Sequence, residues 1–403
     1  MRLIFCVFLF FFVLSCNHDY LAKPIKSGIW RGELVISETE VLPFNFEVTA
    51  KRAIKIYNGE EIIFVDDMTY GKDSVTIRMP VFESYFVLKY DDTLISGHYN
   101  NDGLGRSIPF VARWGVTQRF DVSQDNPYHD ISGRWETTFA KDDGAAAALG
   151  IFSQNGNKVT GTFRSITGDY RFLEGVVDGD QLKLSAFDGS HAYLFVAAVT
   201  DSTMSGTFYS GNHYTDTFSA KRNDVYELPE ADSLMFLKPG YENISFSFPD
   251  SNGNMVSLDD ARFQGKVTIV QIMGTWCPNC LDESRYFSDF YNENNDKDIE
   301  FVALAFEYAN TPEAAFKSID RLKNDVGINY PVLLAQYGTT DKTIAQEKLP
   351  MLNQLLSFPT TIYIDKTGKV RKIHTGFNGP ATGEKYVTFK NEFESFVTEL
   401  LTE

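Results

Sequence analysis

The chain has little cysteine and little positive charge. Four cysteines occur in 403 residues, and 37 lysines and arginines are outnumbered by 54 aspartates and glutamates, for a formal net charge of −17. Binding to nucleic acid needs a basic face against the phosphates, so this charge balance argues against a nucleic-acid partner. The 43% of hydrophobic residues is enough to bury ordinary cores, and the length predicts two or three domains.

The N-terminus predicts export to the cell envelope. A charged start precedes an apolar run over residues 3–14, which is too short for a stable bilayer-spanning anchor and is typical of a secretory signal. Residues 13–16, Val-Leu-Ser-Cys, also resemble a bacterial lipobox. We therefore expect a signal peptide over residues 1–15 and a lipid on Cys16 that holds the protein to the membrane, facing the periplasm. A plain signal peptide cut elsewhere, or a short anchor left in place, is the alternative.

Cysteine use leaves one reactive pair. Cys6 leaves with the signal and Cys16 carries lipid, so that Cys277 and Cys280 are the remaining thiols. A structural disulfide framework is thereby excluded. A zinc site would need two further ligands, and the histidines are scattered along the chain at His98, His129, His191, His213 and His374. We expect no metal, and no cofactor apart from a redox-active Cys277–Cys280 disulfide.

Two stretches, residues 27–120 and residues 131–223, have the pattern of one β unit present twice. In both, short runs of strand-forming residues alternate with Gly, Asn and Asp clusters, which is typical of an antiparallel barrel or sandwich. Three short segments of the first stretch recur in the second: Ser27–Trp30 as Ser132–Trp135, Ser96–Tyr99 as Ser205–Phe208, and Phe110–Arg113 as Phe218–Lys221. This recurrence predicts an internal repeat, with chance similarity of two meanders as the alternative. The pattern leaves open whether the copies form two barrels or one larger sheet.

The pattern changes towards the C-terminus. A tether over residues 16–26 precedes the first copy and a linker over residues 224–240 follows the second, and residues 241–403 then alternate between strands and helices. Residues 266–273 are almost continuously apolar, as expected of a buried parallel strand, and a helix is expected from Cys277 to about Asn294. A later helix carries an apolar stripe that must pack on the sheet: Phe389, Phe393, Phe396, Val397 and Leu400.

Cys277 and Cys280 lie at the start of the first of these helices, where a sulfur has a specific chemical use. Unpaired backbone N–H groups and the positive end of the helix dipole favour a thiolate at the first cysteine. The thiolate is the attacking species in disulfide exchange. The second cysteine lies one helical turn further on, close enough to resolve a mixed disulfide. Pro278 suits the first turn because its missing N–H is not needed there.

The segment Lys266–Glu283, KVTIVQIMGTWCPNCLDE, resembles the TlpA/ResA-type, membrane-anchored, thioredoxin-like oxidoreductases of bacteria. A second motif, Ser-Phe-Pro-Thr-Thr at residues 357–361, opens a later strand. The resemblance covers about residues 241–403 and implies a thioredoxin-like α/β domain there. The expected fold class is therefore a multi-domain protein in which two antiparallel β repeat units precede a thioredoxin-like domain.

The same resemblance implies a substrate groove beside the cysteines. It implies that Pro359 follows a cis peptide bond and faces the two sulfurs, and that the backbone of Phe358 pairs with a substrate strand. Trp276 and Gly376 would border this groove. Alone, a Phe-Pro-Thr sequence would be an ordinary strand entry, and the Trp-Cys-Pro-Asn-Cys motif upstream is what makes it specific.

Glu283 is a further candidate for the chemistry. On a helix it shares a face with Cys280, Phe287 and Phe290, so its carboxyl group is expected to point inward. Buried carboxyl groups have a raised pKa and can exchange a proton with a nearby thiol. The family resemblance assigns that role to a glutamate three residues after the second cysteine. A partly exposed glutamate in the second turn of the helix is the alternative.

The function that these features favour is that of an exported thiol–disulfide oxidoreductase that reduces protein disulfides. Cys277 would attack and Cys280 would resolve. The partners would be exported proteins that contain disulfides and a membrane thiol electron donor. A peroxiredoxin-like peroxidase is an alternative, although such sites usually have a threonine three residues before the reactive cysteine, where this chain has Gly274.

A second alternative is an envelope binding protein that carries an accessory redox domain. In that case aromatic residues of the β units would line a binding face: Trp30, Tyr85, Trp135 and Tyr193. Aromatic residues in small barrels more often belong to the core.

Overall fold

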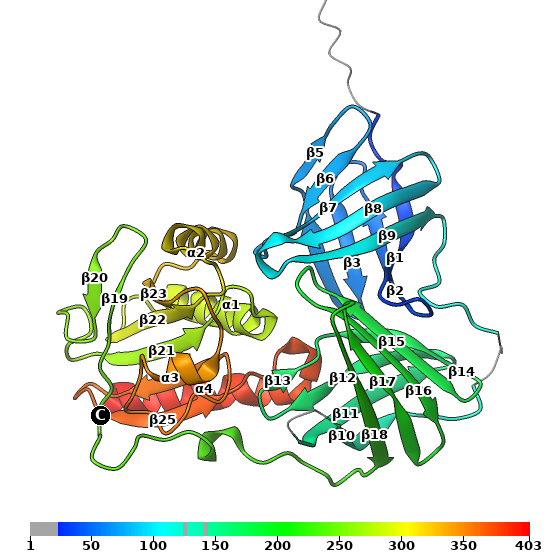
Figure 1. Ribbon diagram of the computed structural model, residues 1–403. Coiled ribbons are helices and arrows are strands. Elements are labelled where there is room, and N and C mark those ends of the chain that lie inside the picture. Colours follow the sequence, from blue (N-terminus) through cyan, green and yellow to red (C-terminus); the bar gives the residue numbers. More distant parts are fainter. Residues whose placement is uncertain (1–22, 124–126, 141–143) are drawn as a thin grey trace, which may run out of the picture.

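The computed structural model describes residues 23–123, 127–140 and 144–403, which fold into three units (Figure 1). The first barrel comprises β1 to β9, the second barrel comprises β10 to β18, and an α/β unit follows. The predicted signal peptide and the predicted lipid site at Cys16 lie outside the described residues. None of the helices within these ranges has the length and apolar character needed to cross a membrane.

The first barrel is a nine-stranded antiparallel sheet that curls back on itself. Strands that follow one another in the chain are neighbours in the sheet, with one exception: β4 and β5 are its two ends. β9 returns to pair with β1. Its strands are β1 (Gly28–Val35), β2 (Val41–Val48), β3 (Ile54–Asn58), β4 (Glu61–Val65), β5 (Met68–Tyr70), β6 (Val75–Arg78), β7 (Ser84–Tyr90), β8 (Leu94–Asn101) and β9 (Arg106–Trp114).

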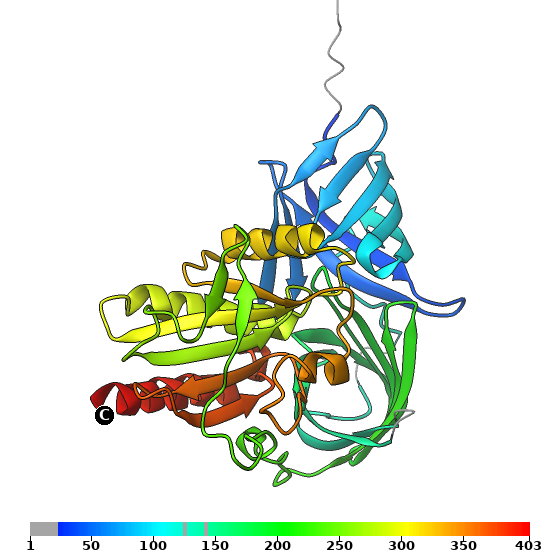
Figure 2. The ribbon, with the colours of Figure 1, turned by 60° about the vertical axis from the view of Figure 1, so that its left-hand side comes forward.

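The second barrel differs at one place: β12 pairs with both β11 and β14, which closes the ring, and the short β13 pairs only with β12. Figure 2 looks towards the opening of this ring. Its strands are β10 (Gly133–Phe139), β11 (Ala146–Asn155), β12 (Lys158–Ser165), β13 (Gly168–Asp169), β14 (Leu173–Asp178), β15 (Gln181–Phe187), β16 (Ala192–Val199), β17 (Thr203–Ser210) and β18 (Tyr214–Arg222). The two copies thus form two separate barrels rather than a sandwich or one larger sheet.

The closing strand pairs have the same register in both barrels. Trp30 pairs with Trp114 and Leu34 with Phe110 in the first. In the second, Trp135 pairs with Arg222 and Phe139 with Phe218. The segments that recur in the sequence therefore occupy equivalent places in the two sheets, as an internal repeat requires.

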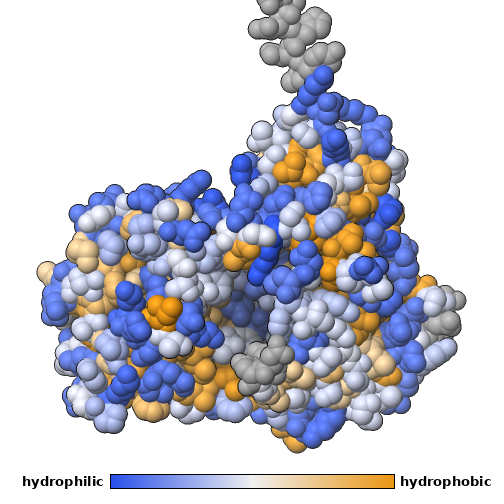
Figure 3. All heavy atoms as spheres, in the orientation of Figure 1, coloured by the Kyte–Doolittle hydropathy of each residue, from blue (hydrophilic) through white to orange (hydrophobic). Residues whose placement is uncertain are grey.

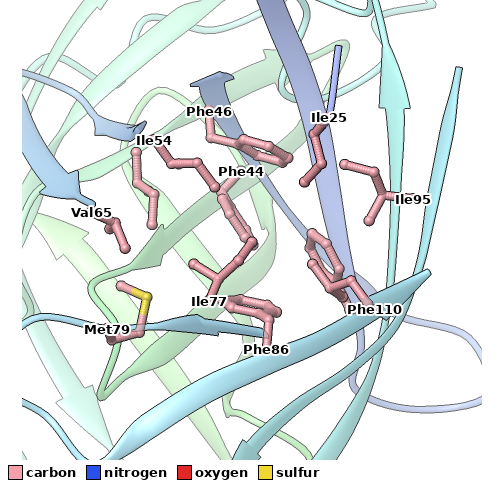
Figure 4. A pocket seen from close by; sticks show the side chains of 12 residues that line it. Ile25, Phe44, Phe46, Ile54, Val65, Ile77, Met79, Phe86, Ile95 and Phe110 are labelled. Carbon is pink, nitrogen blue, oxygen red and sulfur yellow. The ribbon is translucent and has the colours of Figure 1, made fainter. Parts of the chain in front are cut away.

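Side chains fill the interior of the first barrel. Figure 4 shows phenylalanine and aliphatic side chains from several strands converging there, and the cavity between them has a volume of about 20 Å³, roughly the space of one water molecule. Trp30 and Trp135 are completely buried, and each indole N–H donates to a backbone carbonyl four residues earlier. These two tryptophans belong to the barrel cores and do not line a binding face.

The C-terminal unit has a five-stranded sheet in the order β23-β22-β21-β24-β25. β21, β22 and β23 run parallel, and β24 and β25 are antiparallel to their neighbours. A separate hairpin, β19 with β20, precedes it. Its elements are β19 (Ser247–Pro249), β20 (Met255–Ser257), β21 (Val267–Met273), α1 (Pro278–Glu293), β22 (Ile299–Phe306), α2 (Pro312–Val326), β23 (Val332–Gln336), α3 (Lys342–Gln346), β24 (Thr360–Ile364), β25 (Val370–Thr375) and α4 (Glu384–Thr402).

Aromatic packing joins α1 and α4 on the sheet. The ring of Phe287 on α1 lies 5.1 Å from that of Phe393 on α4 and 5.5 Å from that of Phe301 on β22. Most of the predicted stripe on the last helix is buried, namely Phe389, Phe393, Val397 and Leu400. This apolar layer holds α1 against the sheet, and the helix begins beyond the C-terminal end of the central strand β21.

The two barrels are joined by buried hydrogen bonds. The Asn58 side chain donates to the carbonyl of Phe187 at 2.8 Å and accepts from its N–H at 3.1 Å. Arg119, which follows β9, is 5% exposed and donates to the backbone carbonyl and the hydroxyl of Ser185 at 3.0 and 3.1 Å. Paired polar groups of this kind, out of contact with water, fix the first barrel against the second.

Arg171 connects all three units. It follows β13 in the second barrel and is 3% exposed. Its guanidinium contacts Glu61 of the first barrel at 2.5 Å, Asp188 of the second barrel at 3.5 Å, and Asp282 on α1. Burying a charge is costly unless it is paired and hydrogen-bonded, so the three carboxylates and the guanidinium depend on one another.

Replacement of Arg171 by methionine should lower the free energy of unfolding by about 3–5 kcal/mol, because it leaves buried carboxylates without their cation. Urea unfolding followed by tryptophan fluorescence measures the loss. Arg113→Met is the matched control, since Arg113 pairs with Glu33 on the surface and its side chain is 49% exposed; this change should cost less than about 1 kcal/mol. Equal stability of the two variants would contradict the structural role of Arg171.

Candidate active site

Cys277 occupies the N-cap of α1. The fully buried strand β21 ends at Met273, and the chain turns through four residues, of which Cys277 is the last, before the helix begins at Pro278. The Cys277 Sγ accepts a hydrogen bond from the backbone N–H of Cys280 at 3.3 Å. A sulfur in this position faces the unpaired N–H groups and the positive end of the helix dipole, which both favour an anion.

The two cysteines have different surroundings. Both are free thiols; Cys277 is 7% exposed and Cys280 is completely buried. Burial, together with the neighbouring Cys277 sulfur, raises the pKa of Cys280 well above its ordinary value. Cys280 therefore retains its proton at neutral pH, while Cys277 is the sulfur nearer to solvent. Within the described ranges, no group of three or more His, Cys, Asp or Glu side chains is arranged to hold a metal ion.

The Phe358–Pro359 segment lies directly beside Cys277. The peptide bond between these residues is cis, as the family resemblance implied, and the Cys277 thiol lies 3.6 Å from the carbonyl oxygen of Phe358. The N–H of Gly376 donates to the Pro359 carbonyl at 2.8 Å. The Trp276 ring stands edge-on to that of Phe358, with 5.7 Å between centroids. The structure thus brings together all four residues that were expected to border the groove.

Glu283 points into the C-terminal unit, as predicted, and is completely buried. Its carboxyl oxygens accept hydrogen bonds from the Gln271 amide and the Thr361 hydroxyl, both at 2.8 Å. Burial raises the pKa of Glu283 to about 8, although both hydrogen bonds act to lower it. The alternative of a partly exposed glutamate is wrong.

A second buried carboxyl group, Glu307, lies on the other side of the cysteine loop. It follows β22 and accepts hydrogen bonds from the backbone N–H and the hydroxyl of Thr275 at 2.8 and 2.7 Å. Burial raises the pKa of Glu307 to about 7. Sequence reasoning missed this residue, although an acidic side chain directly after a continuous apolar strand was a usable signal.

The second barrel covers the cysteine site. Its segment 165–169, which connects β12 to β13 and includes β13, lies across the groove: the Ser357 hydroxyl donates to the Thr167 carbonyl at 3.2 Å, and the Asn279 amide donates to the Asp169 carbonyl at 3.4 Å. On the other flank the Ser190 hydroxyl donates to the Trp276 carbonyl at 3.1 Å. A separate unit of the chain thus shields the two cysteines from solvent.

A large chamber remains between the second barrel and the C-terminal unit. It has a volume of about 1140 Å³, and Figure 3 shows a hollow where the three units meet. Aromatic residues of the second barrel form much of its wall: Phe139, Tyr170, Tyr193, Phe208 and Tyr214. The C-terminal unit contributes residues next to the cysteines: Trp276, Asn279, Ser357 and Phe358. We call this space the barrel-mouth chamber.

Comparison with known proteins agrees with this geometry. Residues 238–388 match the family model described as Redoxin. The C-terminal unit is a redoxin domain. The thiol-disulfide oxidoreductase ResA of Bacillus subtilis is 29% identical over 142 residues, which cover 35% of this chain and 69% of that protein. ResA of Halalkalibacterium halodurans is 26% identical over 183 residues, covering 45% of this chain and 84% of that protein.

Among solved structures, the thioredoxin domain of a thiol-disulfide oxidoreductase from Bacteroides vulgatus is 24% identical, covers 40% of this chain and 99% of that chain, and has a TM-score of 0.29. The predicted resemblance to ResA-type oxidoreductases is confirmed by the family match and the relatives. The predicted fold class is also confirmed: two barrel-like antiparallel units precede a thioredoxin-like redoxin domain.

The stability of Glu283→Gln relative to wild type should increase as the pH rises. The carboxyl group titrates near 4.5 in the unfolded chain and at about 8 in the redoxin domain, so the folded state holds a proton that the unfolded state has lost between these values. The contribution of Glu283 to the free energy of unfolding of the wild type is therefore greatest below pH 4.5 and decreases as the pH rises towards 8. Between pH 5 and pH 8 the variant should gain roughly 3 kcal/mol relative to wild type.

Urea unfolding at several pH values measures this difference. Glu392→Gln on α4 is the control, because Glu392 is exposed and its replacement should leave the wild-type pH dependence in place. A difference between Glu283→Gln and wild type that is constant from pH 5 to pH 8 would contradict the raised pKa.

Proposed function

We propose that this protein is an exported thiol–disulfide oxidoreductase that reduces disulfides of other proteins through Cys277 and Cys280. Thiol–disulfide exchange is the activity in the names of the ResA relatives, and the redoxin domain fits it. The contrast between the two sulfurs is the observation that supports separate roles for Cys277 and Cys280. Cys277 accepts a helix N–H, whereas Cys280 is buried with a raised pKa.

The reaction divides into two exchanges. The Cys277 thiolate attacks one sulfur of the client disulfide, so that a Cys277–client disulfide forms while the other client sulfur leaves as a thiolate and takes up a proton. Cys280 then loses its proton and attacks the Cys277 sulfur, which forms the Cys277–Cys280 disulfide and releases the second client thiolate. Two electrons thus pass to the client. A membrane dithiol donor then supplies two further electrons, which reduce the Cys277–Cys280 disulfide while the donor becomes a disulfide.

Glu283 supports the second exchange in this proposal. Its carboxyl group is buried close enough to Cys280 for its charge to raise the pKa of that thiol. A carboxyl group with a pKa of about 8 is near the range in which it can both take and give a proton at neutral pH. At neutral pH most Glu283 carboxyl groups are protonated, and we propose that the ionised fraction takes up the proton that Cys280 must lose.

The Cys280→Ser variant should accumulate mixed disulfides with its clients, because the sulfur that would release them is gone. In cells that produce it, non-reducing gels probed for this protein should show slower bands that disappear on reduction. Cys277→Ser, which retains the buried sulfur, is the matched control and should show none. Equal patterns for the two variants would contradict the assignment of Cys277 as the attacking sulfur.

The predicted location is part of the same proposal and is tested separately. With Cys16→Ala, no lipid can be attached, so the protein should move from the membrane fraction to the soluble fraction after cell lysis. Alkaline carbonate washing with immunoblotting measures the distribution. A variant that stays in the membrane fraction would argue for an uncleaved anchor instead.

A further inference from the structure

The groove beside Pro359 is already occupied by the chain itself. A Cβ atom added at Gly376 would lie 2.7 Å from the Ile166 carbonyl oxygen, and one added at Gly168 would lie 2.0 Å from the Asn279 amide nitrogen. Both glycines also have positive φ angles, 78° and 146°. Backbone of the second barrel is therefore seated against the redoxin domain where a substrate strand was expected to pair.

This cover is firmly held. The Asp169 carboxylate accepts hydrogen bonds from the N–H of Gly379 at 2.7 Å and from that of Arg171 at 2.8 Å. The Arg164 guanidinium donates to the Asn378 side chain at 3.1 Å, and Arg171 pairs with Asp282 on α1. Because contacts that are buried or half-buried hold both sides of segment 165–169, a folded client cannot simply lie along Phe358 and Pro359.

The barrel-mouth chamber leaves another route to the cysteines. Trp276 and Asn279, which flank Cys277 on either side in the sequence, form part of its wall. Tyr193 is in the same wall. Burial is the main cause of its raised pKa, followed by the charges of Asp188 and Tyr170 and then by that of Cys277. The chamber therefore reaches the immediate surroundings of the attacking sulfur.

The size of the chamber limits what can enter. Its volume of about 1140 Å³ exceeds the roughly 300–1000 Å³ of sites for small ligands. A strand advances about 3.3 Å per residue and occupies about 4.8 by 10 Å across, so the space holds about seven residues of extended chain. A folded domain of a hundred residues has a radius of gyration of about 13 Å and cannot enter.

The chemistry of the wall indicates which segment fits. Aromatic rings are its largest apolar component, and aromatic side chains pack favourably edge-to-face or offset against such rings. Asp216 is 8% exposed and lines the chamber, with the Tyr214 hydroxyl 3.2 Å from its carboxylate. Its remaining lone pairs suit N–H donors, which an extended peptide backbone carries at every residue except proline.

From these observations we infer that the second barrel is the client-binding part of the protein and that the barrel-mouth chamber takes an unfolded, aromatic-bearing polypeptide segment that carries the disulfide. The inference rests on the proposed function and names its substrate class. The first barrel has no comparable space in its interior, where side chains leave about 20 Å³, and it serves to hold the second in place.

The test measures how fast the purified wild-type protein reduces four disulfide substrates. The protein is first reduced with dithiothreitol, which is then removed. These are an unstructured peptide with a disulfide to a second peptide and phenylalanines beside the cysteine, the same peptide with alanines in their place, a folded protein with a native surface disulfide, and oxidised glutathione. We expect kcat/KM to be at least tenfold higher for the phenylalanine peptide than for the other three.

Two variants alter the chamber without touching the cysteines. Ala147→Trp adds bulk at an exposed chamber position, and Tyr214→Ala removes part of the aromatic wall. Each should lower kcat/KM for the phenylalanine peptide at least tenfold while alkylation of Cys277 by iodoacetamide changes less than twofold. The matched controls are Ala198→Trp on the exposed side of β16 and Tyr128→Ala, which is 66% exposed; both should behave as wild type.

The outcomes separate this inference from the proposed function. If wild type reduces all four substrates at similar rates, or prefers glutathione or the folded protein, the function stands and the chamber inference falls. The same holds if both chamber variants reduce the phenylalanine peptide as wild type does. If wild type reduces none of the four although Cys277 is alkylated, the proposed function fails and the inference fails with it.

Discussion

The arrangement of this molecule depends on one buried cation. Arg171 lies among carboxylates from the first barrel, the second barrel and the redoxin domain. Because it is only 3% exposed, water cannot replace these carboxylates as its partners. Because Asp282 is on the helix that begins beside Cys277, the pairing also sets the distance between the second barrel and the reactive sulfur. Segment 165–169, which ends two residues before Arg171, lies on the groove for the same reason.

Two opposite influences act on neighbouring groups of the site: a backbone N–H favours charge on one sulfur, and burial disfavours charge on the groups behind it. At the end of α1 the Cys277 sulfur meets a backbone N–H, which favours an anion, whereas three residues further on the apolar interior keeps Cys280 protonated. Glu283 is one more turn inward and is shifted in the same sense as Cys280, because each loses its hydration on folding. One helix thus places the three groups of the proposed reaction in different surroundings: Cys277 at its N-cap, and Cys280 and Glu283 completely buried.

Features that depend only on neighbouring residues in the chain could be predicted from the sequence. The spacing of Cys277 and Cys280, the inward face of Glu283 and the recurring strand segments all follow from periodicity, and the structure has them as predicted. Elements too short to show a period were missed, such as β5 with three residues and α3 with five. The cover over the groove and the role of Arg171 were not predictable, because they arise between residues more than a hundred positions apart and no single-segment pattern records such contacts.

The two barrels show how one repeated unit can serve two purposes. Their closing strands keep the same register, so the difference lies in what the side chains do. In the first barrel phenylalanines converge on the interior and exclude a ligand, while Asn58 and Glu61 at the edge facing its partner carry the polar contacts. In the second, the aromatic residues at one end remain part of an open wall. The filled copy is joined to the second barrel by buried polar contacts, and the redoxin domain borders the open end of that barrel with residues that lie next to Cys277 in the sequence.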